Sequence, residues 1–238
     1  MLQTKYSGLV HKFLVELLLK EKSRLSAEEL EVRGFWDRLL ELKYGVSNIE
    51  FKSRKLTPAQ VVVVSTVDFA EGIKTVEKLK QRLRAETQFY ENLYAVPLLG
   101  KFRISLKQSH QWPDKSVTKY VNVFECPPGI PIGYTRFESN SRNIGMLLFQ
   151  GEKGADVRKA NEILGKPWFE VFMDRIIESY RPLHKAGVSL HQYLESGREV
   201  LPAKVRDRYF ARKFRGEKPY ILPLSIGRQR VKRLLRLR

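Results

Sequence analysis

The sequence predicts an α+β fold in which helices come first, an antiparallel sheet follows, and further helices precede a basic C-terminal tail. Apolar residues recur at helical spacing in residues 1–97 and again after residue 155, but they alternate with polar residues between residues 98 and 150. Thirteen of the last 38 residues are Lys or Arg. We therefore divide the chain into a mainly helical region (1–97), a region of sheet and helices (98–197) and a basic, apolar-bearing tail (198–238).

Two amphipathic helices are predicted near the N-terminus. Leucine, valine and phenylalanine residues indicate a first helix from about Ser7 to Lys22. Ser26 and Glu29 have the spacing of a capping box, in which each side chain accepts a hydrogen bond from the other residue's backbone N–H. The second helix should therefore begin at Ser26 and end before Gly45.

Residues 49–65 carry conflicting signals. Thr57 and Pro58 are typical of a helix start, whereas the four consecutive valines at 61–64 favour a strand. If they form a strand, residues 49–52 and 61–65 make a hairpin, and two helices followed by such a hairpin resemble a winged helix.

A third helix should follow, with Asp68 as its N-cap and its end at about Tyr94, before Pro97. Its apolar stripe includes Ile73, and lysines and arginines occupy its other sides.

Four strands are predicted next, at residues 101–107, 119–125, 131–137 and 146–150, and turn-forming residues separate them. They should form an antiparallel meander. In the first strand the apolar residues lie on one side and the basic residues on the other, which predicts one face toward the core and one basic, solvated face. Helices return at about Asp156–Leu164 and Pro167–Ala186, and Gly187 should end the second.

Positive charge is the strongest functional signal. The net charge is +18, and the last 38 residues contribute +11 of it, with two acids among their 13 cations. Such a surface attracts nucleic acid, anionic lipid or an acidic protein. The last eleven residues, RQRVKRLLRLR, contain no aromatic residue, so a peripheral membrane protein ranks third among the interpretations.

Cysteine usage predicts the compartment. Cys126 is the only cysteine, so an intramolecular disulfide and a Cys-based zinc site are both excluded. The chain also has no run of about 20 apolar residues that could cross a membrane. We expect a reducing intracellular compartment such as the cytoplasm, no membrane partner and no cofactor.

The tail and the first strand supply the predicted nucleic-acid-binding residues. Cations displace counterions from phosphates, and aromatic rings stack on unpaired bases. The predicted phosphate contacts in the tail are Arg206, Arg208, Arg212, Lys213, Arg215, Arg228, Arg230, Lys232, Arg233, Arg236 and Arg238. Tyr209 and Phe214 are expected to stack or to pack, and Arg103 and Lys107 add basic charge from the first strand. We therefore expect a non-catalytic nucleic-acid-binding protein, with RNA favoured over DNA, that works beside other protein subunits in a nucleoprotein assembly.

A nuclease is the alternative. The segment IEFKSRK, with Glu50 and Lys52 two residues apart, resembles the third-strand motif of PD-(D/E)xK nucleases. The resemblance implies a Mg²⁺ ion and phosphodiester hydrolysis, and it requires an Asp at the start of a preceding strand. Asp37 has about the right separation, but it falls in the predicted second helix, and Glu29 could be the helical acid of the family.

Overall fold

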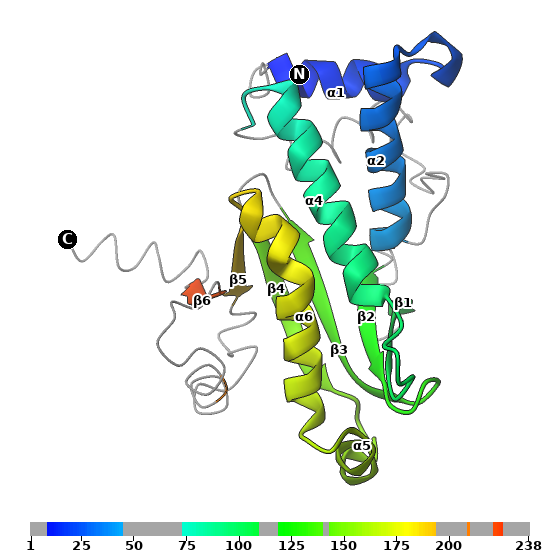
Figure 1. Ribbon diagram of the computed structural model, residues 1–238, viewed down its shortest axis with the longest axis vertical. Helices are drawn as coiled ribbons and strands as arrows, with labels where there is room; N and C mark the ends of the chain where they lie inside the picture. The colour runs from blue at the N-terminus through cyan, green and yellow to red at the C-terminus, as the bar shows by residue number, and fades with distance from the viewer. Residues whose placement is uncertain are drawn as a thin grey trace, which may run out of the picture.

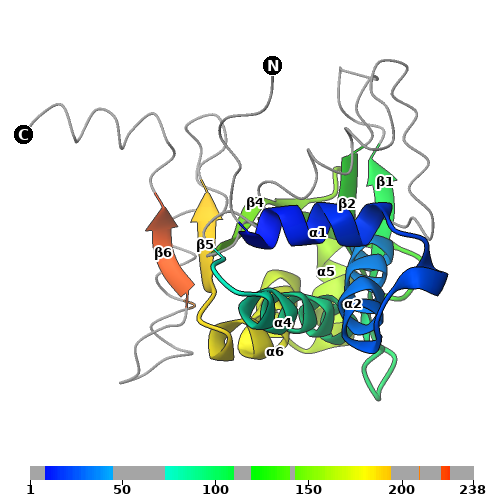
Figure 2. The same ribbon diagram turned by 90° about the horizontal axis from the view of Figure 1, so that it is seen from above.

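The computed structural model describes residues 9–44, 73–109, 119–139, 143–193, 209 and 221–225. Within them a six-stranded mixed sheet carries helices on one of its faces (Figures 1 and 2). The predicted α+β class is confirmed. The segment at residues 49–65, where a winged-helix hairpin is one alternative, lies outside the described residues.

The N-terminal helices agree with the prediction except at one end. Helix α1 spans Leu9–Leu19 and is shorter than expected, because the chain leaves it for a short 3-10 helix at Lys22–Arg24. Helix α2 spans Ala27–Tyr44. Its capping box is confirmed, because the Ser26 N–H donates to the Glu29 carboxylate (2.9 Å) and the Glu29 N–H donates to the Ser26 hydroxyl (3.3 Å).

Helix α4 spans Val76–Tyr94, so its start was predicted too early. Thr75 has extended backbone angles, and its side chain accepts a hydrogen bond from the Lys78 N–H at 3.2 Å. This cap begins the helix at Val76, and Ile73 lies before it as a partly buried residue outside the helix. The predicted end at Tyr94 is confirmed, and Asp68 lies outside the described residues.

The antiparallel meander is confirmed. Strands β1 (Arg103–Ser109), β2 (Lys119–Glu125), β3 (Pro131–Ser139) and β4 (Asn143–Gly151) pair in chain order. All three pairings are antiparallel, and β1 lies at one edge of the sheet.

Two further strands extend the sheet in parallel, which the sequence analysis did not predict. Strand β5 (Ser189–Tyr193) pairs with β4, and β6 (Ile221–Ser225) pairs with β5. Strand β6 contains Pro223, which cannot donate to a neighbour and is therefore tolerated at this edge of the sheet.

The C-terminal helices were predicted to within a residue. Helix α5 spans Val157–Leu164 and α6 spans Trp168–Lys185. The Asp156 carboxylate accepts a hydrogen bond from the Lys159 N–H at 3.1 Å and caps α5. Gly187, with φ of +72°, turns the chain from α6 into β5.

Aromatic packing joins the helices to the sheet. Phe172 of α6 stacks on Phe124 of β2, with 5.0 Å between the ring centroids. Phe89 of α4 meets Phe137 of β3 edge to face at 5.3 Å. Buried side chains from α1 through Tyr209 form one hydrophobic cluster, so helices and sheet share a core.

A charged cluster lies inside this core. The carboxylate of Glu86 on α4 is fully buried and accepts hydrogen bonds from Lys43 of α2 (3.1 Å) and from the Ser139 hydroxyl of β3 (2.6 Å). Arg82, one turn earlier on α4, forms an ion pair with it at 2.8 Å. Burial alone would raise the pKa of Glu86, but the attraction of Arg82 and Lys43 lowers it. The cluster therefore links α2, α4 and β3 through an ionised carboxylate.

Gly133 provides a test of the contact between α6 and the sheet. A Cβ atom at this position would lie 2.4 Å from two carbons of the Trp168 ring and 2.9 Å from the Gln150 carbonyl oxygen. We expect Gly133→Ala to lower the free energy of unfolding by about 1–3 kcal/mol, measured by urea denaturation. Gly34→Ala on α2 is the control, because nothing lies within 4 Å of its added Cβ. Equal urea midpoints for the two variants would contradict this packing.

Candidate nucleic-acid interface

Most of the predicted phosphate-binding residues lie in the tail, outside the described residues. The same holds for Phe214, and for Glu50 and Lys52 of the nuclease alternative. Tyr209, Arg103, Lys107 and Asp37 are described, and the structure places each of them in a defined environment.

Tyr209 packs into the core. Its side chain is 4% exposed, and its hydroxyl donates a hydrogen bond to the Asp174 carboxylate of α6 at 2.7 Å. Burial is the largest cause that raises the pKa of Tyr209, and the neighbouring carboxylate adds to it. Of the two roles predicted for this ring, packing is the one observed, and stacking on a base would require the ring to leave its site.

Arg103 and Lys107 lie on the edge strand β1 and converge on one carboxylate of the neighbouring strand. Glu125 of β2, which pairs with Arg103 in the sheet register, is fully buried. Arg103 Nη2 lies 2.6 Å from one of its oxygens, and Lys107 Nζ lies 2.5 Å from the other. The Gly129 N–H (2.9 Å) and the Ser105 hydroxyl (3.2 Å) also donate to this carboxylate.

These four donors keep Glu125 ionised. Burial alone would raise its pKa, but hydrogen bonds from Lys107, Gly129 and Arg103 lower the pKa to about 2. The side chains of Arg103 and Lys107 remain 46% and 44% exposed. Two half-exposed cations are thus held in place by one buried anion, which leaves one net positive charge facing solvent at the sheet edge.

The sheet face that carries these residues is not solvated throughout, as the sequence analysis expected. Val121, Val123 and Glu125 are two residues apart along β2 and therefore lie on the same face of the sheet. The two valines are each only 7% exposed. The expected solvent exposure of this face is therefore wrong for β2 and is observed only for the cations of β1. Alternation assigns side chains to faces, but it does not say whether a face is covered.

A second group of cations lies at one end of the helix pair formed by α4 and α6. Lys74 precedes α4, Lys78 lies in its first turn, and Arg181 and Lys185 lie in the last turns of α6. All four are exposed and form no ion pair with any residue that the structure describes.

The two helices are antiparallel, which brings these cations to the same end. Arg175 near the middle of α6 donates a hydrogen bond to the Leu93 carbonyl at the end of α4. Arg82, eleven residues earlier, acts electrostatically on Tyr180, further along α6. The start of α4 and the end of α6 therefore both face the upper end of the molecule in Figure 1, where α4 extends beyond α6. Residues 73–109, which include α4 and β1, hold eight Lys or Arg and three acids, the largest excess of any described segment.

Three findings among the described residues concern metal binding, the cysteine and the acid of the nuclease alternative. No group of three His, Cys, Asp or Glu side chains among them lies close enough to hold a metal ion. The Cys126 thiol is buried and lies 3.8 Å from the Ala160 carbonyl oxygen, and burial raises its pKa, which disfavours the nucleophilic thiolate. Asp37 lies on α2, as predicted, and forms ion pairs with Lys22 (2.8 Å) and Arg33 (2.9 Å).

Comparison with protein-family models, with curated proteins and with solved structures finds no match for this chain. In the described part of the chain, no helix is both long enough and apolar enough to cross a membrane.

Glu125, which holds the two β1 cations, was not predicted from the sequence. Its period-two spacing from Val121 and Val123 places it on a strand face, but the register with β1 depends on the turn between the strands. The four cations on α4 and α6 were also missed, because only the packing of the helices brings them to one end.

Glu125→Gln tests the ionised carboxylate. Because the native pKa, about 2, lies below the ordinary value of 4.5, the stabilisation is complete above about pH 4.5 and is lost as the pH falls toward 2. We expect the variant to be less stable than the wild type by about 3 kcal/mol near neutral pH and to approach it near pH 2, by urea denaturation across this range. The control is Glu162→Gln, at an exposed position of α5, which should change stability little at any pH. A Glu125→Gln deficit of the same size at both ends of the range would contradict the account.

Proposed function

We propose that this protein binds nucleic acid, with RNA favoured over DNA, as a non-catalytic subunit of a nucleoprotein assembly. One observation carries the proposal. The chain has a net charge of +18, and its last 38 residues hold 13 cations and two acids. A polyanion with regularly spaced phosphates is the partner that this distribution of charge suits best, since each phosphate contact releases condensed counterions.

The described fold supports the proposal through the cations that it leaves exposed. Lys74, Lys78, Arg181 and Lys185 have no ion-pair partner in the described residues, and Arg103 and Lys107 are held half-exposed at the sheet edge. We infer that phosphates contact the helix ends, the β1 edge and the tail. The open face of a sheet is not the platform here, because β2 buries Val121 and Val123.

The preference for RNA rests on the tail. Basic residues alternate there with aromatic ones, of which Phe214 and Tyr220 remain candidates for stacking. Sequence-specific RNA recognition commonly uses unpaired bases that stack on aromatic side chains. In a duplex the bases stack on one another, so an aromatic side chain cannot stack on them.

Salt dependence tests the phosphate contacts. Removing residues 228–238 leaves β6 in the chain and deletes six cations. Each phosphate contact contributes about 0.7 to the slope of log affinity against log salt for single-stranded nucleic acid, so the truncated protein should lose a slope of about 3–4. We expect this loss in fluorescence anisotropy with single-stranded RNA, together with unchanged thermal unfolding.

A matched pair of variants tests the helix ends. Replacing Lys74, Lys78, Arg181 and Lys185 with Gln should lower the slope by about 2–3, because these cations have no described acid partner. Replacing Lys20 and Lys80 with Gln should lower it by less than about 1, because each is bound to a carboxylate, Glu29 or Glu31. An unchanged slope in both the truncated protein and the quadruple variant would overturn the proposal.

A further inference from the structure

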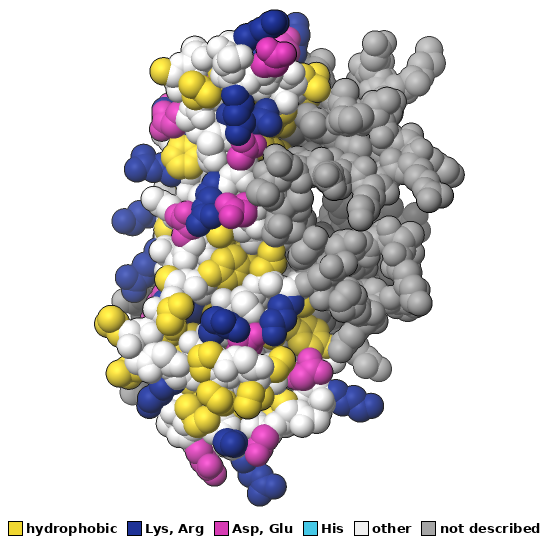
Figure 3. All heavy atoms as spheres, turned by 90° about the vertical axis from the view of Figure 1, so that its right-hand side faces the viewer, with side chains coloured by type: hydrophobic (Ala, Val, Ile, Leu, Met, Phe, Trp, Pro, Cys, Tyr) yellow, Lys and Arg dark blue, Asp and Glu magenta, His cyan; other side chains and the backbone are white. Residues whose placement is uncertain are grey.

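Exposed apolar side chains gather at one end of the molecule. Among the described residues seven large hydrophobic side chains are exposed, and five of them lie on three neighbouring segments: Val96, Leu98, Leu99, Ile130 and Val157. Leu98 is fully exposed and Leu99 is 79% exposed. Figure 3 shows hydrophobic side chains gathered in the lower half of one face, with Lys and Arg side chains among them. We name this set of five residues the apolar end.

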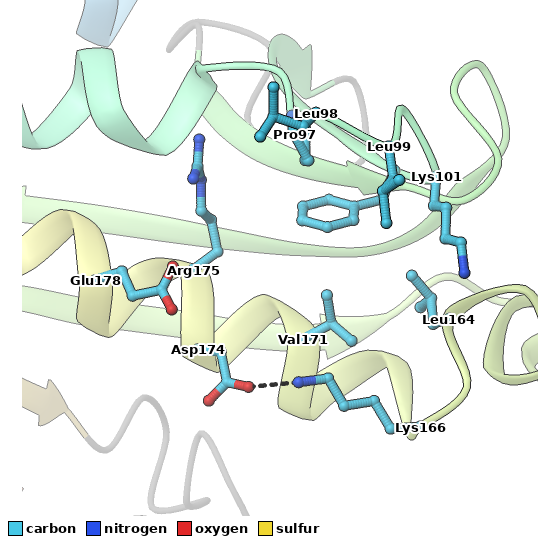
Figure 4. A pocket seen from close by; sticks show the side chains of 11 residues that line it. Pro97, Leu98, Leu99, Lys101, Leu164, Lys166, Val171, Asp174, Arg175 and Glu178 are labelled. Carbon is cyan, nitrogen blue, oxygen red and sulfur yellow. Dashed lines mark hydrogen bonds and ion pairs between the residues drawn. The ribbon is translucent and has the colours of Figure 1, made fainter.

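Two of the three segments, the α4–β1 loop and α5, line a cavity together with α6. The loop from α4 to β1 supplies Pro97, Leu98 and Leu99, and Leu164 of α5 lies across from them. The cavity has a volume of about 480 Å³. In Figure 4 the side chain of Leu99 points toward Val171 of α6 and Leu164, so apolar groups form its walls.

The β2–β3 turn, which carries Ile130, is fixed to α5 close by. The Cys126 thiol of this turn lies 3.8 Å from the Ala160 carbonyl oxygen of α5. The cavity and the exposed side chains around it therefore form one surface.

The acids that line the cavity are matched by cations. Asp174 forms an ion pair with Lys166 at 2.7 Å, and Glu178 acts on Arg175 electrostatically. Lys101 lines the cavity as well, is exposed, and forms no ion pair with a described residue. The charge left at the mouth is therefore positive.

Cations also outnumber acids beside Val157, where Asp156 is the one acid within two residues. Arg158 and Lys159 directly follow Val157, are exposed, and likewise form no ion pair within the described part of the chain. An apolar surface flanked by unpaired cations complements an apolar segment flanked by carboxylates.

We propose that the apolar end binds a segment of another protein in which apolar side chains are flanked by Asp and Glu. A small molecule in the cavity would leave Ile130 and Val157 uncovered, because neither lines the cavity and both are exposed. The exposed groups are aliphatic and cannot stack on bases, which disfavours RNA here. A second copy of this chain, docked by the same surface, would bring cations against cations. The surface thus gives the assembly a protein contact separate from the nucleic-acid contacts.

A pair of synthetic peptides tests the proposal with the full-length chain. Both are helices of about 16 residues with Leu and Phe on one face, and the other face carries Glu in one and Lys in its twin. We expect the Glu peptide to bind at least about tenfold more tightly than the Lys peptide in fluorescence anisotropy. Leu98→Ser/Leu99→Ser should abolish this binding, and Lys101→Glu should narrow or reverse the preference between the peptides.

Controls separate this contact from the others. The double Ser variant should fold normally, since both side chains are exposed, and should bind RNA as the wild type does, so this proposal and the nucleic-acid proposal can fail independently. Leu30→Ser, at an exposed position of α2, should not affect peptide binding. Equal binding of the two peptides, binding of neither, displacement of the Glu peptide by RNA, or a dimer that the double Ser variant dissociates would each overturn the proposal.

Discussion

The buried carboxylate of Glu86 determines how the helices sit on the sheet. It draws Lys43 from α2, Arg82 from its own helix and Ser139 from β3 to one point, so the three elements are fixed relative to one another. Removing one partner of such a buried pair typically costs about 3–5 kcal/mol, because the remaining charge stays buried. The position of α4 on the sheet, and hence of the cations along its exposed side, depends on this contact.

The same rule applies at Glu125, where Arg103 and Lys107 bind a second buried carboxylate. In a chain with 44 cations and 26 acids, each of the two carboxylates that are buried in the described part of the chain is bound by two cations. Arg103 and Lys107 remain half-exposed although they bind Glu125. Other cations, such as Lys74 and Lys185, have no ion-pair partner among the described residues. Positive charge that the fold does not neutralise is thus directed outward, toward the partner that the proposed function requires.

Local signals predicted most of the described fold. The capping box at Ser26, the helix at about Asp156–Leu164 and the four antiparallel strands all follow from short-range chemistry and from the period of the apolar residues. Strand β5 is short and pairs in parallel with β4, so no hairpin turn connects it to its partner in the sequence. The start of α4 was missed because Asp68 and Thr75 are both good caps in sequence. The site was predicted less well, because register brings Glu125 to Arg103, and only helix packing turns the start of α4 and the end of α6 toward the same end of the molecule.

The central claim is that the positively charged surface of this protein binds nucleic acid. The most direct measurement is the ratio of absorbance at 260 nm to that at 280 nm for the full-length protein purified at low salt without nuclease, followed by sequencing of the bound material. The account predicts a ratio well above that of protein alone, which falls after RNase or high salt, and it predicts RNA in the sequenced fraction. A protein-like ratio at low salt, with no binding when RNA or DNA is added back, would contradict it.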